Sequence, residues 1–118
     1  MIDLFSSDTP NGKKISIMLE EIGFEYAVKK MDLSKGDQFK EDFKEISPFS
    51  KIPAIIDHSN NKESVFESGA ILIYLAEKSG RFYEKENKLK IDQWLMAQMG
   101  IVGPFVGQYH YCLLYTSP

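Results

Sequence analysis

The chain has 118 residues, of which 43% are hydrophobic and 26% are charged, and its formal net charge is −3 at pH 7. This length and composition are typical of one ordinary globular domain with a hydrophobic core. The weak negative charge provides no basic field to hold a nucleic acid, and no segment has the apolar length of a membrane span. We therefore expect neither a nucleic-acid partner nor a membrane partner.

The cysteine and histidine content limits the chemistry further. Cys112 is the one cysteine of the sequence, which excludes an internal disulfide and a cysteine-rich zinc site. His58 and His110 have no partner at metal-ligand spacing, and we expect no metal. The start, MIDLFSSD, lacks the basic and apolar regions of a signal peptide. These features together predict a cytoplasmic location.

The first elements of the chain are a short strand and an amphipathic helix. The alternating apolar positions of residues 2–6 predict the strand. Pro10 disfavours helix at Thr9 and suits the first turn of the helix that follows. Gly23 is well placed to end that helix in the left-handed conformation. The helix has one apolar face at the i, i+3, i+4, i+7 spacing, formed by Ile15, Met18, Leu19 and Ile22.

The next residues continue the alternation of strands and helices. Apolar patterning and turn residues predict strands at 24–33, 51–57 and 64–66, and helices at about 39–46 and 68–79. The order β-α-β-α-β-β-α indicates an α/β fold, a mixed sheet with helices on both faces. A helix between each of the first strands predicts right-handed parallel crossovers, and the final hairpin predicts an antiparallel edge.

The character of the sequence changes after Gly80. Residues 82–87 are polar and are predicted to form a linker. Residues 88–111 are predicted to be helical, and Gly100, Gly103 and Pro104 are expected to bend or break this helix. The helix is hydrophobic on too many sides to stand alone in water, so we expect it to pack into something larger.

Two motifs at a specific spacing carry a family resemblance: SKIPAI at 50–55 and FESGAILIYLAEK at 66–78. With the order of elements, they resemble the amino-terminal, thioredoxin-like domain of glutathione transferases. TPNGKK, DLSKGDQF and GPFVGQYHY are most similar to the bacterial nu-class group, and the fungal nitrogen regulators share much of the pattern. The resemblance implies a thioredoxin-like domain at 1–81 and the first helix of a truncated all-helical domain at 88–111. The last residues, 112–118, do not continue the pattern, and we expect them to be non-native.

The resemblance also implies a ligand, glutathione, and a homodimer when the protein is full length. The Ile52–Pro53 bond would be cis, and the Ile52 backbone would pair with the cysteinyl part of glutathione. Without the family, an edge-strand proline is an equally good interpretation of Pro53. Ser68 is predicted to be the N-cap of its helix and to bind the γ-glutamyl carboxylate, while Glu67 would bind the ammonium.

Gln38 and Lys51 are weaker candidates, for the glycine carboxylate of glutathione. A lysine beside a strand is more often simply solvated, and Lys13 and Lys14 have the same simple interpretation, although their charge would favour an anionic ligand.

Thr9 and Asn11 are the candidate catalytic residues. A thiol has a pKa of about 8.5, and lowering that value by about 2 units requires roughly 2.7 kcal/mol. One hydrogen bond to a charged group contributes about 1.5–3 kcal/mol and a helix N-terminus about 0.3–1 kcal/mol. The residues alone favour a turn-shaping role for Thr9 and Asn11. The family resemblance favours stabilisation of a glutathione thiolate, by either residue.

Three functions remain open from the sequence. The first is a glutathione transferase-type enzyme whose glutathione thiolate attacks a disulfide, as the nu-class resemblance implies, or an electrophilic carbon. The second is a non-catalytic glutathione-binding regulatory domain. The third is an inactive fragment, because members of the family also use residues of the helical domain and of the dimer partner.

Overall fold

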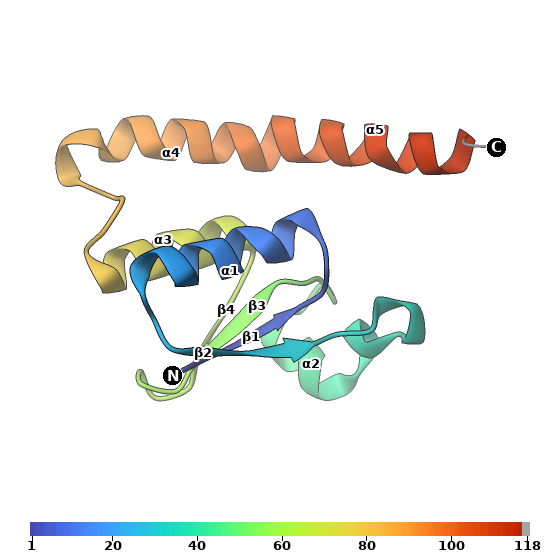
Figure 1. The fold of residues 1–118 in the computed structure, drawn as a ribbon, viewed down its shortest axis with the longest axis horizontal. Helices are drawn as coiled ribbons and strands as arrows, with labels where there is room; N and C mark the ends of the chain where they lie inside the picture. Colours follow the sequence, from blue (N-terminus) through green and yellow to red (C-terminus); the bar gives the residue numbers. More distant parts are fainter. Residues whose placement is uncertain (117–118) are drawn as a thin grey trace. The chain divides into compact units, whose positions relative to one another are not determined.

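The computed structural model describes residues 1–116 and forms two compact units, residues 1–81 and the residues from 82 onward (Figure 1). The first unit has the predicted α/β composition. Its elements are β1 (Ile2–Ser6), α1 (Pro10–Ile22), β2 (Tyr26–Lys30), η1 (Leu33–Lys35), η2 (Asp37–Phe39), α2 (Glu41–Ile46), β3 (Ala54–Asp57), β4 (Glu63–Phe66) and α3 (Ser68–Ser79).

The four strands form one mixed sheet in the order β2-β1-β3-β4. β1 and β2 are parallel, whereas β3 runs antiparallel to both β1 and β4. The expected fold class is confirmed, but the expected parallel crossover into β3 is wrong. The reason is that β3 begins at Ala54 opposite Phe5, at the end of the sheet where β2 leaves it. The segment with α2 therefore stays at that end and does not return along the strands.

Two apolar clusters hold the layers of this unit together. Helices α1 and α3 lie side by side on one face of the sheet, and α2 lies on the other (Figure 1). On the α2 face, Met31, Phe43 and Ala54 form a smaller buried cluster. The main core lies between the sheet and the α1–α3 pair, and its buried residues are Ile2, Leu4, Ile15, Leu19, Ile22, Ile55, Ile71 and Leu75.

Both long helices of the first unit end at a glycine, α1 at the predicted Gly23 and α3 at Gly80. Gly23 and Gly80 have φ values of 72° and 70°, in the left-handed region that glycine adopts without a steric penalty. The N–H of Gly23 bonds to Glu20 and that of Gly80 to Ala76, which satisfies carbonyls at the ends of α1 and α3.

A buried carboxylate at the end of β3 fixes α3 to the sheet. Asp57 has no exposed surface. It accepts hydrogen bonds from the Tyr74 hydroxyl at 2.6 Å, from the Lys78 ammonium, and from the Ser59 hydroxyl at 2.7 Å and N–H at 3.0 Å. Burial would raise the pKa of this carboxyl, but the hydrogen bonds from Lys78, Tyr74 and Ser59 outweigh it and hold the pKa well below its usual range.

This network predicts a pH-dependent loss of stability on substitution of Asp57. Because the folded-state pKa lies below the unfolded value of about 3.9, the charged carboxylate stabilises the fold above about pH 4 and loses this effect as the pH falls further. Asp57→Asn should lower the free energy of unfolding by about 2–3 kcal/mol at neutral pH. In urea titrations at several pH values, the difference from the wild type should shrink below pH 4.

The control for this substitution is Asp8→Asn, which removes the carboxylate of an exposed ion pair with Lys13. Such surface pairs contribute about 0–1 kcal/mol. A difference between wild type and Asp57→Asn that stays constant from neutral to acid pH would contradict the role of the charge.

The second unit is helical in the described residues. Its elements are η3 (Lys85–Asn87), α4 (Lys88–Ala97), η4 (Gln98–Val102) and α5 (Gly103–Thr116). Of the bend or break expected near Gly100, Gly103 and Pro104, the break does not occur, because the helix continues through η4 as a π-helical turn. The Gly103 N–H bonds to the Gln98 carbonyl. A Cβ on Gly103 would lie 2.9 Å from that oxygen, so the glycine permits the wider turn.

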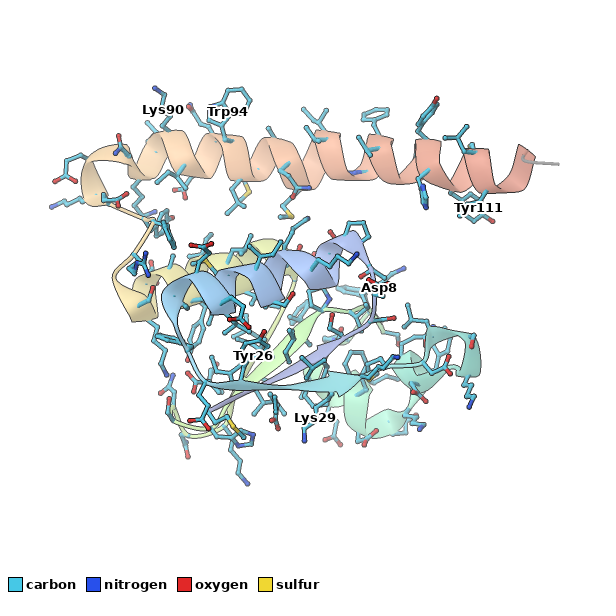
Figure 2. All side chains as sticks on the ribbon, viewed as in Figure 1. Asp8, Tyr26, Lys29, Lys90, Trp94 and Tyr111 are labelled. Carbon is cyan, nitrogen blue, oxygen red and sulfur yellow. The ribbon has the colours of Figure 1, made fainter. Side chains whose placement is uncertain are left out.

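The helix of the second unit has many apolar side chains on its surface. Trp94, Phe105 and Leu114 are 72%, 67% and 65% exposed, and Figure 2 shows Trp94 beside Lys90 on one side of α4. The helices described in residues 1–116 are not long and apolar enough to cross a membrane. The expected non-native tail begins at residue 112 in α5, and its last two residues, 117–118, lie outside the described part of the chain.

Candidate functional site

The strand register brings the predicted site segments to one end of the sheet. Ala54, the first residue of β3, lies opposite Phe5 near the end of β1 and opposite Phe66 at the end of β4. The junctions that carry Thr9 and Asn11, Ile52 and Pro53, and Glu67 and Ser68 therefore meet at this end. The segment with Gln38 leaves β2 at the same end, where the Met31 N–H bonds to the Ser6 carbonyl at 2.8 Å.

Thr9 is the N-cap of α1. Its backbone is extended, and its hydroxyl oxygen accepts the Gly12 N–H at 3.1 Å. Within residues 1–116 the hydroxyl proton of Thr9 has no acceptor, so it remains available as a donor. Gly12 allows this close approach of α1 to β1, because an added Cβ would lie 2.8 Å from the Ser7 carbonyl oxygen. Asp8, labelled in Figure 2, marks the same junction.

Asn11 presents its donors at the exposed start of α1. Its amide oxygen, Oδ1, accepts a hydrogen bond from the Lys14 ammonium at 2.7 Å. An ammonium only donates, so this contact identifies the oxygen and turns the Nδ2 group to the opposite side. Neither Nδ2 nor the backbone N–H of Asn11 has an acceptor in the described part of the chain. With the Thr9 hydroxyl, the helix start therefore offers several unused donors.

The Ile52–Pro53 peptide bond is cis, as the resemblance implies. The N–H and C=O of Ile52 make no hydrogen bond within the described residues, which leaves a donor and an acceptor unpaired just before β3. The preceding residue is held by the buried side chain of Ser47. Its hydroxyl donates to the Lys51 carbonyl at 2.6 Å and accepts the Lys51 N–H at 3.2 Å. The sequence did not indicate this role of Ser47, because its partner is the backbone of Lys51, which any residue type would provide.

Ser68 is not the N-cap of α3, and this prediction is wrong. The N-cap is Glu67, whose carbonyl accepts the first helical bond from the Ile71 N–H at 2.9 Å. Ser68 is therefore the first helical residue, with 8% of its surface exposed. Glu67 has φ 74° and ψ 118°, a backbone region that costs a non-glycine residue about 1–3 kcal/mol. Such strain is concentrated at ligand sites, and Glu67 is exposed where β4 joins α3.

Gln38 and Lys51 are less well prepared for a carboxylate. The Gln38 amide donates to the Leu33 carbonyl at 3.4 Å, and its buried Oε1 has no hydrogen-bond partner among the described residues. A carboxylate only accepts, so Gln38 would bind one through the second N–H of its Nε2 group, and its unpaired Oε1 would take no part. The Lys51 side chain is exposed, and its ammonium forms no ion pair within residues 1–116. The described residues also contain no cluster of histidine, cysteine and acidic side chains that would hold a metal.

The order of elements and the four-stranded sheet define a thioredoxin-like domain, and comparison with known families identifies its class. The family model of the glutathione S-transferase N-terminal domain matches residues 2–77. The chain therefore belongs to the glutathione S-transferase family.

Individual relatives agree with this family. The chain is 50% identical over 117 residues to the disulfide-bond oxidoreductase YfcG of Escherichia coli (strain K12), with 94% of this chain and 54% of YfcG covered. It is 35% identical over 118 residues to the transcriptional regulator URE2 of Saccharomyces cerevisiae, with 89% of this chain and 32% of URE2 covered. A crystal structure of a glutathione transferase family member from Pseudomonas fluorescens Pf-5, with two glutathione bound, matches at TM-score 0.84 and 49% identity. The match covers 91% of this chain and 49% of that protein. The chain thus spans about half or less of the length of these relatives.

The N-cap role of Thr9 predicts a specific loss of stability. Thr9→Ala removes the oxygen that accepts the Gly12 N–H and should lower the free energy of unfolding by about 1 kcal/mol. Thr9→Ser keeps that oxygen and should stay close to the wild type. Urea denaturation of the three proteins measures the difference. Equal losses for Ala and Ser would show that the methyl group, and not the cap, supports this junction.

Proposed function

We propose that this protein binds glutathione at the Thr9 end of the sheet and activates its thiolate for disulfide reduction. The observation that carries the proposal is a set of unused donors, the Thr9 hydroxyl and the Asn11 amide, at a helix start whose loop contains no cysteine. In this arrangement the ligand supplies the sulfur and the protein supplies the hydrogen bonds. The name of YfcG, a disulfide-bond oxidoreductase, supports the disulfide reaction over conjugation.

These donors can supply the free energy that is needed to lower the pKa of the thiol. Lowering the pKa of a thiol by about 2 units requires roughly 2.7 kcal/mol of preference for the thiolate. One hydrogen bond to a charged group supplies about 1.5–3 kcal/mol, and the N-terminus of α1 adds about 0.3–1 kcal/mol. One donor with the helix end therefore supplies about 1.8–4 kcal/mol, which brackets the requirement, and the Thr9 hydroxyl and the Asn11 amide together exceed it.

The remaining residues of the site take the other parts of glutathione. The free N–H and C=O of Ile52, held before the cis Pro53, pair with the cysteinyl backbone as an added strand does. The start of α3 at Ser68 binds the γ-glutamyl carboxylate, and the exposed Glu67 carboxylate binds the ammonium. Lys51 takes the glycine carboxylate through its ammonium, and Gln38 does so through the second N–H of its amide. No metal takes part in these contacts.

The reaction follows thiol–disulfide exchange with two glutathione molecules. The bound thiolate attacks one sulfur of a disulfide, forms a mixed disulfide and releases the other half as a thiolate, which takes the proton lost by glutathione. A second glutathione attacks the mixed disulfide, so that glutathione disulfide and a second thiol leave. The two glutathione molecules bound in the Pseudomonas fluorescens structure support this stoichiometry.

The second unit, from residue 82 onward, is proposed to lead into an all-helical domain of the whole protein. The exposed Trp94, Phe105 and Leu114 support residues 88–111 as the start of an all-helical domain whose apolar surface other helices or a second copy of the protein cover. Residues 82–87, with η3, are the connection to it. We propose that the full-length protein is a cytoplasmic homodimer. We also propose that residues 112–118 originate outside the family.

A second candidate function is glutathione binding without turnover. The 35% identity to a transcriptional regulator favours it, because the same donors would bind a thiol whether or not a reaction follows. Calorimetric titration of glutathione into this chain, beside a turnover assay, separates the two functions. Binding with no turnover would support the regulator, and absence of binding would indicate an inactive fragment.

The activity prediction compares two substrates. The protein should reduce hydroxyethyl disulfide with glutathione in a coupled assay faster than it conjugates chlorodinitrobenzene. Asn11→Ala should lower the disulfide rate by about 10- to 100-fold, because one hydrogen bond to the thiolate is lost. Gln93→Ala, which removes an exposed amide from α4, is the matched control and should keep the rate. Strong conjugation without disulfide turnover would contradict the proposed reaction.

A further inference from the structure

Lys14 contacts the Asn11 side chain at the start of α1. Its side chain reaches back along the first turn of α1 and donates to Asn11 Oδ1 at 2.7 Å. The neighbouring lysine behaves differently, because Lys13 forms an ion pair with Asp8 at 3.0 Å. Two adjacent lysines with the same charge therefore have different partners at the same helix start.

The contact determines which atom of Asn11 is available to a ligand. An asparagine amide has an acceptor oxygen on one side and a donor NH2 group on the other, and without a fixed partner either can face the site. Because the Lys14 ammonium can only donate, it holds the oxygen on its own side. The NH2 group is then the part of Asn11 that faces away from Lys14, and a thiolate needs such a donor.

We propose that Lys14 is a positioning residue, which holds the Asn11 amide so that its NH2 group, rather than its oxygen, meets the thiol of bound glutathione. The inference rests on the proposed function, since it concerns the same thiol. Lys14 itself does not touch the sulfur. It acts through Asn11, and its effect therefore requires the Asn11 side chain.

The charge of Lys14 adds to this orientation. A cation at the amide oxygen polarises the amide and strengthens the hydrogen bonds that its NH2 group donates. In chains of hydrogen bonds this effect is about 10–30% per bond. Lys14 is only half-exposed, and burial lowers the pKa of its ammonium from the ordinary value. Partial burial also leaves its charge less screened by water than that of Lys13, whose side chain is 63% exposed.

The experiment measures the pKa of the thiol of bound glutathione, from the ultraviolet absorbance of the thiolate as the pH is raised. The proteins are this chain as wild type, Lys14→Met, Lys14→Arg and Lys13→Met, with Lys14→Met also made in an Asn11→Ala background. Thermal unfolding of each protein and its affinity for glutathione verify that the fold and the site are intact.

Lys14→Met should raise the pKa of the bound thiol by about half to one unit, because the Asn11 amide is no longer held as a donor. This shift leaves about 3- to 10-fold less thiolate at a pH below both pKa values, and disulfide turnover should fall by the same factor there and recover above the pKa. Lys14→Arg should restore the wild-type pKa. Lys13→Met removes the same charge one residue away and should leave the pKa unchanged.

The outcomes separate this inference from the function on which it rests. A wild type that binds no glutathione, or does not lower its thiol pKa, would overturn both. A wild type with a lowered thiol pKa that Lys14→Met does not change would overturn the role of Lys14 alone. An equal shift for Lys13→Met would show a general charge effect, and a full shift in the Asn11→Ala background would show that Lys14 does not act through Asn11. Either result would also overturn the inference.

Discussion

The antiparallel pairing of β3 between β1 and β4 is the constraint on which the candidate site depends. Ala54 lies opposite Phe5 in one neighbour and opposite Phe66 in the other, so its place in the sheet determines where three loops emerge. A shift of one residue would turn Ile55 from the main core to the α2 face and expose the core side of the strand. The same apolar burial that fixes the register therefore fixes the site.

The two ends of β3 differ in how their polar groups are satisfied. At the far end, Asp57 receives hydrogen bonds from Tyr74, Lys78 and Ser59, which hold α3 against the sheet. At the near end, the Ile52 backbone and donors at the start of α1 have no partner in the described residues. Exposed donors of this kind cost little in water, and they become useful when a charged ligand replaces the water. The hydrogen bonds at the Asp57 end of β3 thus hold the fold together, while the unpaired groups at the Ile52 end are available to a ligand.

Much of the first unit could be predicted from its sequence because the signals are local. The apolar stripe of α1, the glycines after α1 and α3 and the alternation in β1 each depend on a few neighbouring residues. The direction of β3 could not be predicted from periodicity, since parallel and antiparallel strands alternate in the same way. The N-cap at Glu67 was missed for a related reason: Ser68 is the better capping residue, but the positive φ of Glu67 comes from the way β4 joins α3.

The residues of the candidate site could be predicted from sequence motifs, but the residues that hold them in place could not. Thr9, Asn11, Ile52 and Pro53 belong to short motifs, so sequence alone could single them out. Ser47 and Asp57 act through partners fixed by the folded chain, and the Lys14 contact depends on a side-chain conformation. The π-helical turn at η4 was also missed, because glycine and proline in a helix indicate a break as readily as a change of turn.

In the proposed function, glutathione supplies the sulfur and the start of α1 supplies the hydrogen bonds. The decisive measurement is a crystal structure of this protein with glutathione bound. We expect the cysteinyl backbone of the ligand to pair with Ile52 and its sulfur to lie within hydrogen-bond distance of the Thr9 hydroxyl or the Asn11 NH2 group. A sulfur directed away from α1, or a ligand bound at another end of the sheet, would refute this function of the α1 start.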